Sequence, residues 1–255
     1  MATSINSSPV HGERDLRGQT VVVIGGSSGI GLETARLARA KGADIILTAR
    51  DPDRLHRAGL ELGASIAAFD ATDFGRLGRF FDALPAPIDH LLVTGPRPCC
   101  APLAGFDLDA ARGDVDAHLL LPLQVAWHAA GKVRPGGTLL FMSGTGGRRP
   151  AAGLALSAAL TAALPAMTRS LALQVAPVRV NLIAAGFAGA PSSASPPGDR
   201  IEQRREQLRT TLPIGRVVGP ADIATLAVHL MTNTAVTGAT FDIDGGQQLV
   251  EGRAE

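Results

Sequence analysis

The stretch that decides the fold is VVVIGGSSGIGLETARLARAKGA, residues 21–43. It opens with an apolar, β-branched run, which indicates a buried strand, and passes through a glycine-rich turn into a segment with helical spacing. Gly25, Gly29 and Gly31 lie between the two elements. Because glycine lets backbone N–H groups and a helix start come close to a ligand, the turn indicates a pyrophosphate site. Taken alone, it also fits a tight turn with close helix packing.

Six more short apolar runs follow the first strand, and helix-like segments of ten or more residues separate most of them. They occupy residues 43–49, 65–69, 88–95, 137–144, 178–184 and 239–244. Runs such as VVVI and LLFM show no alternation of polar and apolar residues, which is typical of strands buried on both faces. The pattern predicts an α/β fold with a parallel sheet covered by helices on both sides.

The composition favours one soluble domain that binds small molecules. With 255 residues, 45% of them hydrophobic, the chain can bury a large core, and its formal charge of +1 provides no broad field for nucleic acid or an anionic membrane. Residues 1–16 are polar and predict a loose leader before a single domain over residues 17–255. No signal peptide or membrane span is expected.

The cysteines and histidines argue against an oxidising compartment and a metal site. Cys99 and Cys100 are adjacent and so ill placed for a disulfide, which favours a cytoplasmic protein. The six histidines show no ligand spacing, so no metal is expected. Arg97, Arg148 and Arg149 lie in predicted loops, either as solvated side chains or as attractors of an anionic ligand.

The glycine spacing G-x-x-x-G-x-G is similar to the TGxxxGxG motif of the short-chain dehydrogenase/reductase family, with Ile24 in place of threonine. Three later stretches resemble the family in the same order: FDATD at 69–73, VNLIAAGF at 180–187, and the segment from LPIGR to DGG at 212–246. The resemblance covers residues 16–246. It implies a doubly wound Rossmann-type sheet in the order 3-2-1-4-5-6-7, a substrate lid around residues 190–213, and a homodimer or homotetramer.

The family resemblance also implies a nicotinamide dinucleotide and the residues that hold it. The predicted cofactor-binding residues are Gly25, Ser27, Ser28, Gly29, Ile30, Gly31, Arg50, Asp70, Ala71, Thr94, Gly95, Pro96, Met142, Ser143, Gly186, Phe187 and Ala188. Where enzymes that prefer NAD usually carry a carboxylate, this chain has Ala49 followed by Arg50. Arg50 can bind a 2′-phosphate, so NADP(H) is predicted; alternatively it is a solvated helix-start residue.

The catalytic residues of the family are missing. Its serine, tyrosine and lysine correspond to Gly144, Ser157 and Thr161, and the whole chain contains no tyrosine. His118, at the position of the family's helix asparagine, is the best candidate for a replacement proton donor, because imidazole titrates near neutrality. Ser143 and Ser157 are weaker candidates. All three also fit packing or cofactor contacts.

Three functions remain open from the sequence. The first is an atypical NADP-dependent oxidoreductase on a carbonyl or alcohol, whose proton comes from His118, water or the substrate. The second is a catalytically silent NADP(H)-binding sensor or interaction protein. The third is a non-redox lyase or isomerase that reuses the pocket. The substrate is an unknown small molecule in each case.

Overall fold

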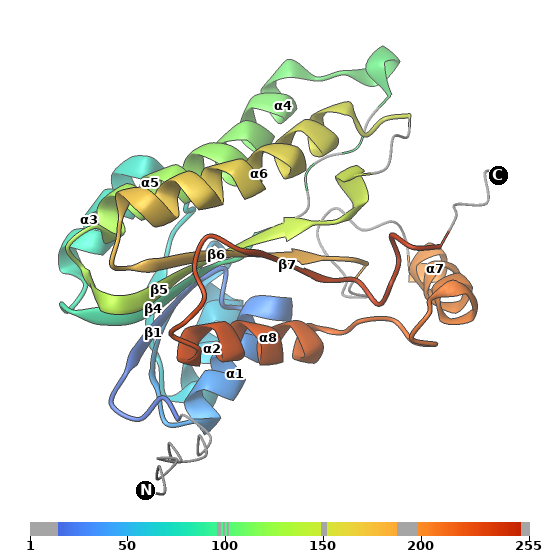
Figure 1. Cartoon of the computed structure of the whole chain (residues 1–255). Helices are drawn as coiled ribbons and strands as arrows, with labels where there is room; N and C mark the ends of the chain where they lie inside the picture. The colour runs from blue at the N-terminus through green and yellow to red at the C-terminus, as the bar shows by residue number, and fades with distance from the viewer. Residues whose placement is uncertain are drawn as a thin grey trace, which may run out of the picture.

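A computed structural model describes residues 15–95, 98, 100, 102–148, 152–187 and 198–250, with the backbone alone for residues 198–201. Its centre is a seven-stranded sheet in the order β3-β2-β1-β4-β5-β6-β7, and every pair of neighbouring strands is parallel. The predicted Rossmann-type sheet and its strand order are therefore confirmed. Figure 1 shows the sheet between two layers of helices.

The seven strands coincide closely with the predicted apolar runs. They are β1 (Thr20–Ile24), β2 (Asp44–Ala49), β3 (Ser65–Ala68), β4 (Ile88–Val93), β5 (Val133–Gly144), β6 (Arg179–Ala185) and β7 (Thr240–Ile243). Only β5 begins clearly earlier than predicted, with a shift in its register against β4 between Ile88 and His90. Every residue of β4 and β6 is buried, as expected for central parallel strands.

The helices form one layer on each face of the sheet (Figure 1). The described helices are α1 (Gly29–Ala40), α2 (Pro52–Leu62), α3 (Phe74–Ala83), α4 (Leu108–Val115), α5 (Leu121–Ala129), α6 (Ala155–Gln174), α7 (Gly198–Thr211) and α8 (Pro220–Thr232). Short 3₁₀ turns η1 (Leu103–Gly105) and η3 (Gly146–Arg148) and a π-turn η2 (Asp116–Leu120) complete the set. One core lies under α1, α2 and α8, and the other under α3, α5 and α6.

The structure describes part of the predicted leader and part of the predicted lid. Leu16 is fully buried and its N–H donates to Lys41 O at 2.8 Å, so the first packed residue falls inside the range predicted as leader. Of the predicted lid, residues 190–197 lie outside the described residues, and the charged segment that follows forms α7. Through Leu208 and Leu212, both buried, this helix and the segment after it contact the domain.

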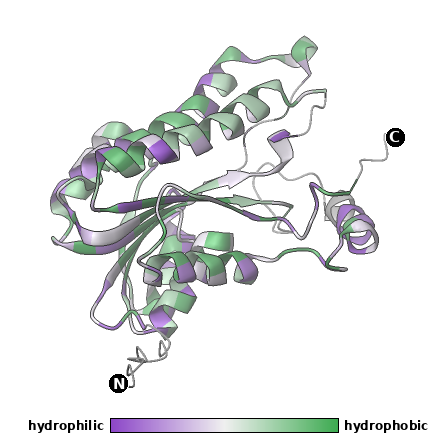
Figure 2. Ribbon diagram, in the orientation of Figure 1, coloured by the Kyte–Doolittle hydropathy of each residue, from purple (hydrophilic) through white to green (hydrophobic). Residues whose placement is uncertain are grey.

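Helix α6 is long and apolar enough to cross a membrane by length and composition, with a mean hydropathy of 1.3. Buried core helices of soluble proteins meet the same criterion. Here α6 packs along β5 and β6 through Leu160, Leu164 and Leu171, and a third of its length is buried. Two thirds of α6 is therefore not fully buried, and Figure 2 shows that most of its ribbon carries the colour of hydrophobic residues.

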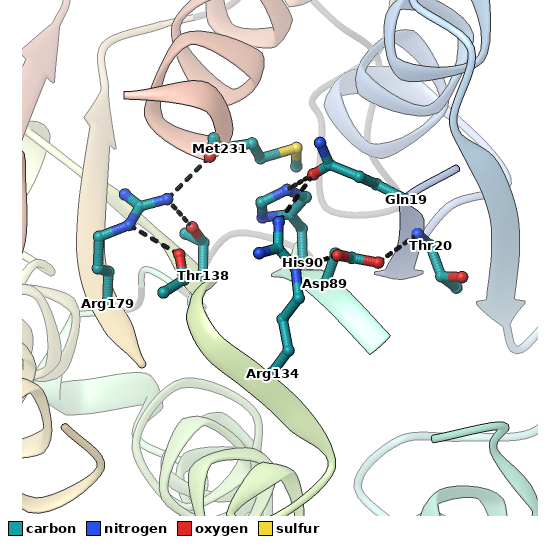
Figure 3. Close-up of polar contacts among 9 residues, drawn as sticks. Gln19, Thr20, Asp89, His90, Arg134, Thr138, Arg179 and Met231 are labelled. Carbon is teal, nitrogen blue, oxygen red and sulfur yellow. Dashed lines mark hydrogen bonds and ion pairs between the residues drawn. The ribbon is translucent and has the colours of Figure 1, made fainter. Parts of the chain in front are cut away.

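A polar network occupies the amino ends of the central strands, opposite the glycine turn (Figure 3). We call it the amino-end network, and its members are Gln19, Asp89, His90, Arg134, Thr138 and Arg179. Asp89 accepts from Thr20 N at 2.7 Å and pairs with Arg134, while His90 Nε2 lies 2.7 Å from Gln19 Oε1. Arg179 contacts Thr138 and the last carbonyls of α8. The network thus links β4 to β5, and β6 to β5 and to the end of α8.

Candidate functional site

The glycine turn between β1 and α1 is built by close backbone contacts. The N–H groups of Gly25 and Gly26 donate to Thr48 O at 2.9 and 3.0 Å, which ties the turn to β2. Gly25 has a φ of +86°, and a Cβ there would lie 2.6 Å from Thr94 O. A Cβ on Gly31 would collide with Gly25 O. These positions therefore require glycine.

The start of α1 is left open for a ligand. Ser28 at the N-cap makes no side-chain capping bond, and the first turn carries no acidic residue. By contrast, α2 and α3 are capped by Asp51 and Asp73, each accepting a backbone N–H at 3.0 Å. Gly29, with φ +54°, has open space beside its α-carbon. The uncapped N–H groups and the positive end of the helix dipole favour an anion at this place.

A pocket of about 450 Å³ adjoins the glycine turn on the side of α2. Its lining residues are Ser27, Ser28, Leu32, Arg54, Arg57, Ala58 and Glu61. The sequence prediction named the two serines and the nearby Arg50, but it missed Arg54 and Arg57. Their three-residue spacing on a helix that begins directly after Arg50 is the signal that could have found them, because such residues share a helix face.

The ends of β3 and β4 place the other residues predicted beside the adenosine. Asp70 follows β3 and is exposed, and its Oδ1 accepts from Thr72 N at 2.9 Å and from Thr72 Oγ1 at 2.7 Å. Thr94 ends β4 and donates to Gly25 O at 3.0 Å. The structure thus brings Asp70 and Thr94 to the same edge of the sheet as the glycine turn. Pro96 lies outside the described residues.

The ends of β5, β6 and β7 form the second half of this edge. Ser143 and Gly144 pair in register with Ala184 and Ala185, and Gly186 and Phe187 follow directly. The segment after β7 closes against them: Gln247 Oε1 accepts from Phe187 N at 3.0 Å. A Cβ on Gly186 would lie 2.7 Å from the Cβ of Asp244, so this approach also requires glycine. The sequence prediction missed Gln247, and Ala188 lies outside the described residues.

The two positions that the family resemblance aligns with its tyrosine and lysine lie on the same face of α6. Ser157 and Thr161 lie one turn apart on α6, and Thr161 Oγ1 donates to Ser157 O at 2.9 Å. The η3 turn lies directly against this turn of helix, because a Cβ on Gly147 would collide with Thr161 Oγ1 and lie 2.8 Å from the α-carbon of Ala158. The close approach of the η3 turn to α6 therefore requires both the glycine at residue 147 and a short side chain at residue 161.

His118 lies in the π-turn η2, which packs against α6. Its Nδ1 is 2.9 Å from Asp114 O, and since a carbonyl can only accept, Nδ1 carries the proton in a neutral ring. Nε2 is then the basic nitrogen. Pro122 lies in the first turn of α5, directly after the π-turn. Ser143 is half-buried at the end of β5.

Arg148 is fixed at the rim of the site by an acidic partner. Its Nη2 donates to Asp242 Oδ1 at 2.7 Å, and its Nη1 contacts Gln248 at 3.2 Å. The hydrogen bonds of this pair raise the pKa of Arg148 and lower the pKa of Asp242. Arg148 is thus an exposed side chain with a carboxylate partner, and not an unpartnered cation. Arg97, Cys99 and Arg149 lie outside the described residues, and the described part holds no cluster of metal-binding side chains.

Comparisons with known proteins agree with this geometry. A family model described as enoyl-(acyl carrier protein) reductase matches residues 24–248. The chain is 29% identical to the short-chain dehydrogenase/reductase ATR9 of Stachybotrys chlorohalonatus, covering 92% of this chain and 98% of the relative. It is 32% identical to galactitol 2-dehydrogenase (L-tagatose-forming) of Cereibacter sphaeroides, covering 91% and 95%.

A solved structure of the protein BdcA in complex with NADPH superposes with a TM-score of 0.81 at 27% identity, covering 90% of this chain and 94% of that one. The matches run through both halves of the sheet edge, from the glycine turn to the segment after β7. The chain belongs to the short-chain dehydrogenase/reductase family.

Proposed function

We propose that the protein binds NADP(H) at the carboxyl ends of its strands and acts as an oxidoreductase on a carbonyl or alcohol. The observation that carries the proposal is the glycine turn with its uncapped helix start, which suits a pyrophosphate. When bound, the nicotinamide would supply the hydride. The relative BdcA has been solved with NADPH. In this chain Asp70 and Ala71 would contact the adenine. Gly186 and Phe187 would contact the nicotinamide.

Proton handling in this proposal does not depend on residue 157. Acid–base help is typically worth about 10²- to 10⁴-fold in rate, so a reductase without a positioned donor would be slow. His118 is the proposed substitute, because its π-turn packs against α6 and its Nε2 can take up a proton. The imidazolium so formed would donate that proton to the carbonyl oxygen, and the neutral ring would accept one from an alcohol in the reverse direction. Water or the substrate itself is the alternative source of the proton.

A second function, NADP(H) binding without turnover, is favoured by one specific observation. The backbone of Gly147 lies against Thr161 and Ala158, so the turn of α6 at which the family keeps its proton-handling groups is covered by the η3 turn. In that case the binding of NADP(H) would act on a partner rather than on a substrate. The cofactor site is the same in both proposals.

We also propose that a second copy of the chain covers α5 and α6. The exposed apolar side chains here include Trp127, 69% exposed, together with Leu123 on α5 and Leu173 on α6. Exposed apolar side chains on a helix layer are typical of a subunit interface. The molar mass in solution, from light scattering, tests this proposal.

The experiment that tests the function combines calorimetry with turnover. Titration of NADPH into the protein should give saturable binding, and absence of binding would overturn both functions. The loss of NADPH absorbance is then followed against a panel of aldehydes and ketones. Turnover that is abolished in His118→Ala but retained in the matched Ser157→Ala variant supports the oxidoreductase with His118 as donor. Tight binding with no turnover on the panel supports the second function instead.

A further inference from the structure

The pocket beside the glycine turn is lined by two serines and two arginines. Ser27 and Ser28 come from the turn, and Arg54 and Arg57 from consecutive turns of α2. Its volume is about 450 Å³. Arg50, the cation predicted from the sequence, does not line it.

The acidic residue of the pocket, Glu61, has its cationic partner on α1, where Arg36 also pairs with Glu33. Glu61 accepts from Arg36 Nε at 2.6 Å and from Arg36 Nη2 at 2.9 Å, and these bonds lower the pKa of its carboxyl. Glu61 lies four residues after Arg57, a spacing that would suit an ion pair within α2. Because Glu61 bonds across to α1 instead, it leaves the Arg57 guanidinium available.

The two arginines differ in their existing partners. Arg54 Nε lies 3.1 Å from Asp51 Oδ2, an ion pair within the first turn of α2. Arg57 makes no hydrogen bond or ion pair with any residue in the described ranges. A guanidinium with hydroxyl groups beside it and no carboxylate of its own is suited to bind a phosphate monoester, whose three oxygens accept several charged bonds.

We propose that Arg57, assisted by Arg54, determines the preference for the phosphorylated cofactor by binding the 2′-phosphate from the side of α2. This rests on the proposed NADP(H) site and adds to it a specificity residue distinct from Arg50. Ser27 and Ser28 add hydroxyl donors to the same pocket. Leu32 and Ala58 are its apolar lining residues.

The test measures binding of the adenosine half alone, so it needs no turnover. Adenosine 2′,5′-bisphosphate and 5′-AMP are titrated calorimetrically into the full chain. In Arg57→Gln the affinity for the bisphosphate should fall about ten- to a hundredfold, the worth of one charged hydrogen bond, while the affinity for 5′-AMP stays unchanged. Arg54→Gln should lose less affinity for the bisphosphate, because Arg54 already forms an ion pair with Asp51.

The matched control is Arg39→Gln, which removes the same charge at the far end of α1, where Arg39 Nη1 pairs with Asp44 at 3.3 Å. It should leave both affinities as they are. A bisphosphate affinity that is retained in Arg57→Gln and lost in Arg50→Gln would overturn the inference while the proposed function stands. A wild-type chain that binds NADPH but favours neither ligand would overturn the inference and the NADP preference together. Thermal melting of each variant verifies the fold, which an exposed arginine should not affect.

Discussion

The two ends of the central sheet use charged and polar groups in opposite ways. At the amino end, Asp89 pairs with Arg134, and Arg179, only 5% exposed, reaches six acceptors. At the carboxyl end, α1 starts without a side-chain cap, and Arg57 lies within ion-pair distance of no carboxylate among the described residues. The polar groups at the amino end bond to one another and stabilise the fold, whereas the carboxyl end presents hydrogen-bond donors that suit an anion.

This difference shows where substitutions should damage stability and where they should damage binding. The two ends are separated by the length of the strands, and few side chains belong to both. Changes in the amino-end network should therefore lower the free energy of unfolding and leave cofactor affinity unchanged. Changes at the glycine turn and the α2 pocket should do the reverse. The predictions below test that separation, beginning with the largest expected effect.

Replacing the buried arginine should have the greatest effect on stability. In Arg179→Met, the carbonyls of Leu230, Met231 and Asn233, now bonded at 2.8, 2.8 and 2.9 Å, would remain buried without a donor. The cation at the end of the α8 dipole would also be lost. We expect the free energy of unfolding to fall by about 3–5 kcal/mol, measured by urea denaturation.

Two further variants test whether the fall in the free energy of unfolding comes from the lost hydrogen bonds and charge of Arg179. Arg179→Lys keeps the charge and some of the donors, so it should lose less than Arg179→Met. Arg209→Met removes an exposed ion pair on α7 and should change the free energy of unfolding by less than about 1 kcal/mol. A changed affinity of Arg179→Met for NADPH would contradict the separation of the two ends.

The second prediction concerns the response of the amino-end network to acid. His90 is 1% exposed, and burial lowers its pKa to about 4, with Arg179 and Arg134 acting in the same direction and Asp89 against it. Between the unfolded pKa near 6.5 and about 4, the unfolded chain binds a proton that the folded chain excludes. Stability should therefore fall as the pH falls through this range, by roughly 3 kcal/mol in all.

The variant His90→Gln isolates this contribution. Its amide can still donate to Gln19 Oε1, 2.7 Å from His90 Nε2, but it does not titrate. The free energy of unfolding, measured by denaturation at several pH values, should fall less steeply in the variant than in the wild type between pH 6.5 and 4. His56→Gln, an exposed change on α2, should keep the wild-type slope. Equal slopes in His90→Gln and the wild type would show that another group is responsible.

The parts of this molecule that could be predicted from the sequence are those set by local pattern. The strands and the glycine turn were predicted because apolar runs and glycine spacing act over a few residues, as at Gly25 and Gly31. The amino-end network could not be predicted, because Gln19, Asp89 and Arg179 meet only after the sheet has formed.

The candidate site divides in the same way. Arg50 was noticed because it directly follows a strand, whereas Arg57 becomes significant only when α2 is placed against the glycine turn. The sequence shows that the chain has no tyrosine and that Ser157 and Thr161 stand where the family resemblance places the tyrosine and the lysine. It could not show that Gly147 lies against the same turn of α6, since the two segments meet only in the folded chain.

That contact leads to the last and smallest prediction, which concerns restoring the missing groups. If the scaffold around α6 were unchanged, Ser157→Tyr with Thr161→Lys should raise reductase activity. Because the backbone of Gly147 lies against Thr161 Oγ1 and Ala158, a lysine stem at residue 161 would have to displace the η3 turn. We therefore expect no gain in NADPH oxidation over the carbonyl panel and a loss of about 1–3 kcal/mol in the free energy of unfolding.

The control for this pair is Thr161→Ala. It removes a hydroxyl that only bonds its own helix, to Ser157 O at 2.9 Å and Ala158 O at 3.1 Å, and it adds no bulk against η3. Its stability should stay within about 1 kcal/mol of the wild type. If the double variant gains turnover without losing stability, the η3 turn can be displaced at little cost in free energy. The contact at Gly147 would then be no barrier to proton transfer, and the carboxyl end would be open to chemistry as well as to binding.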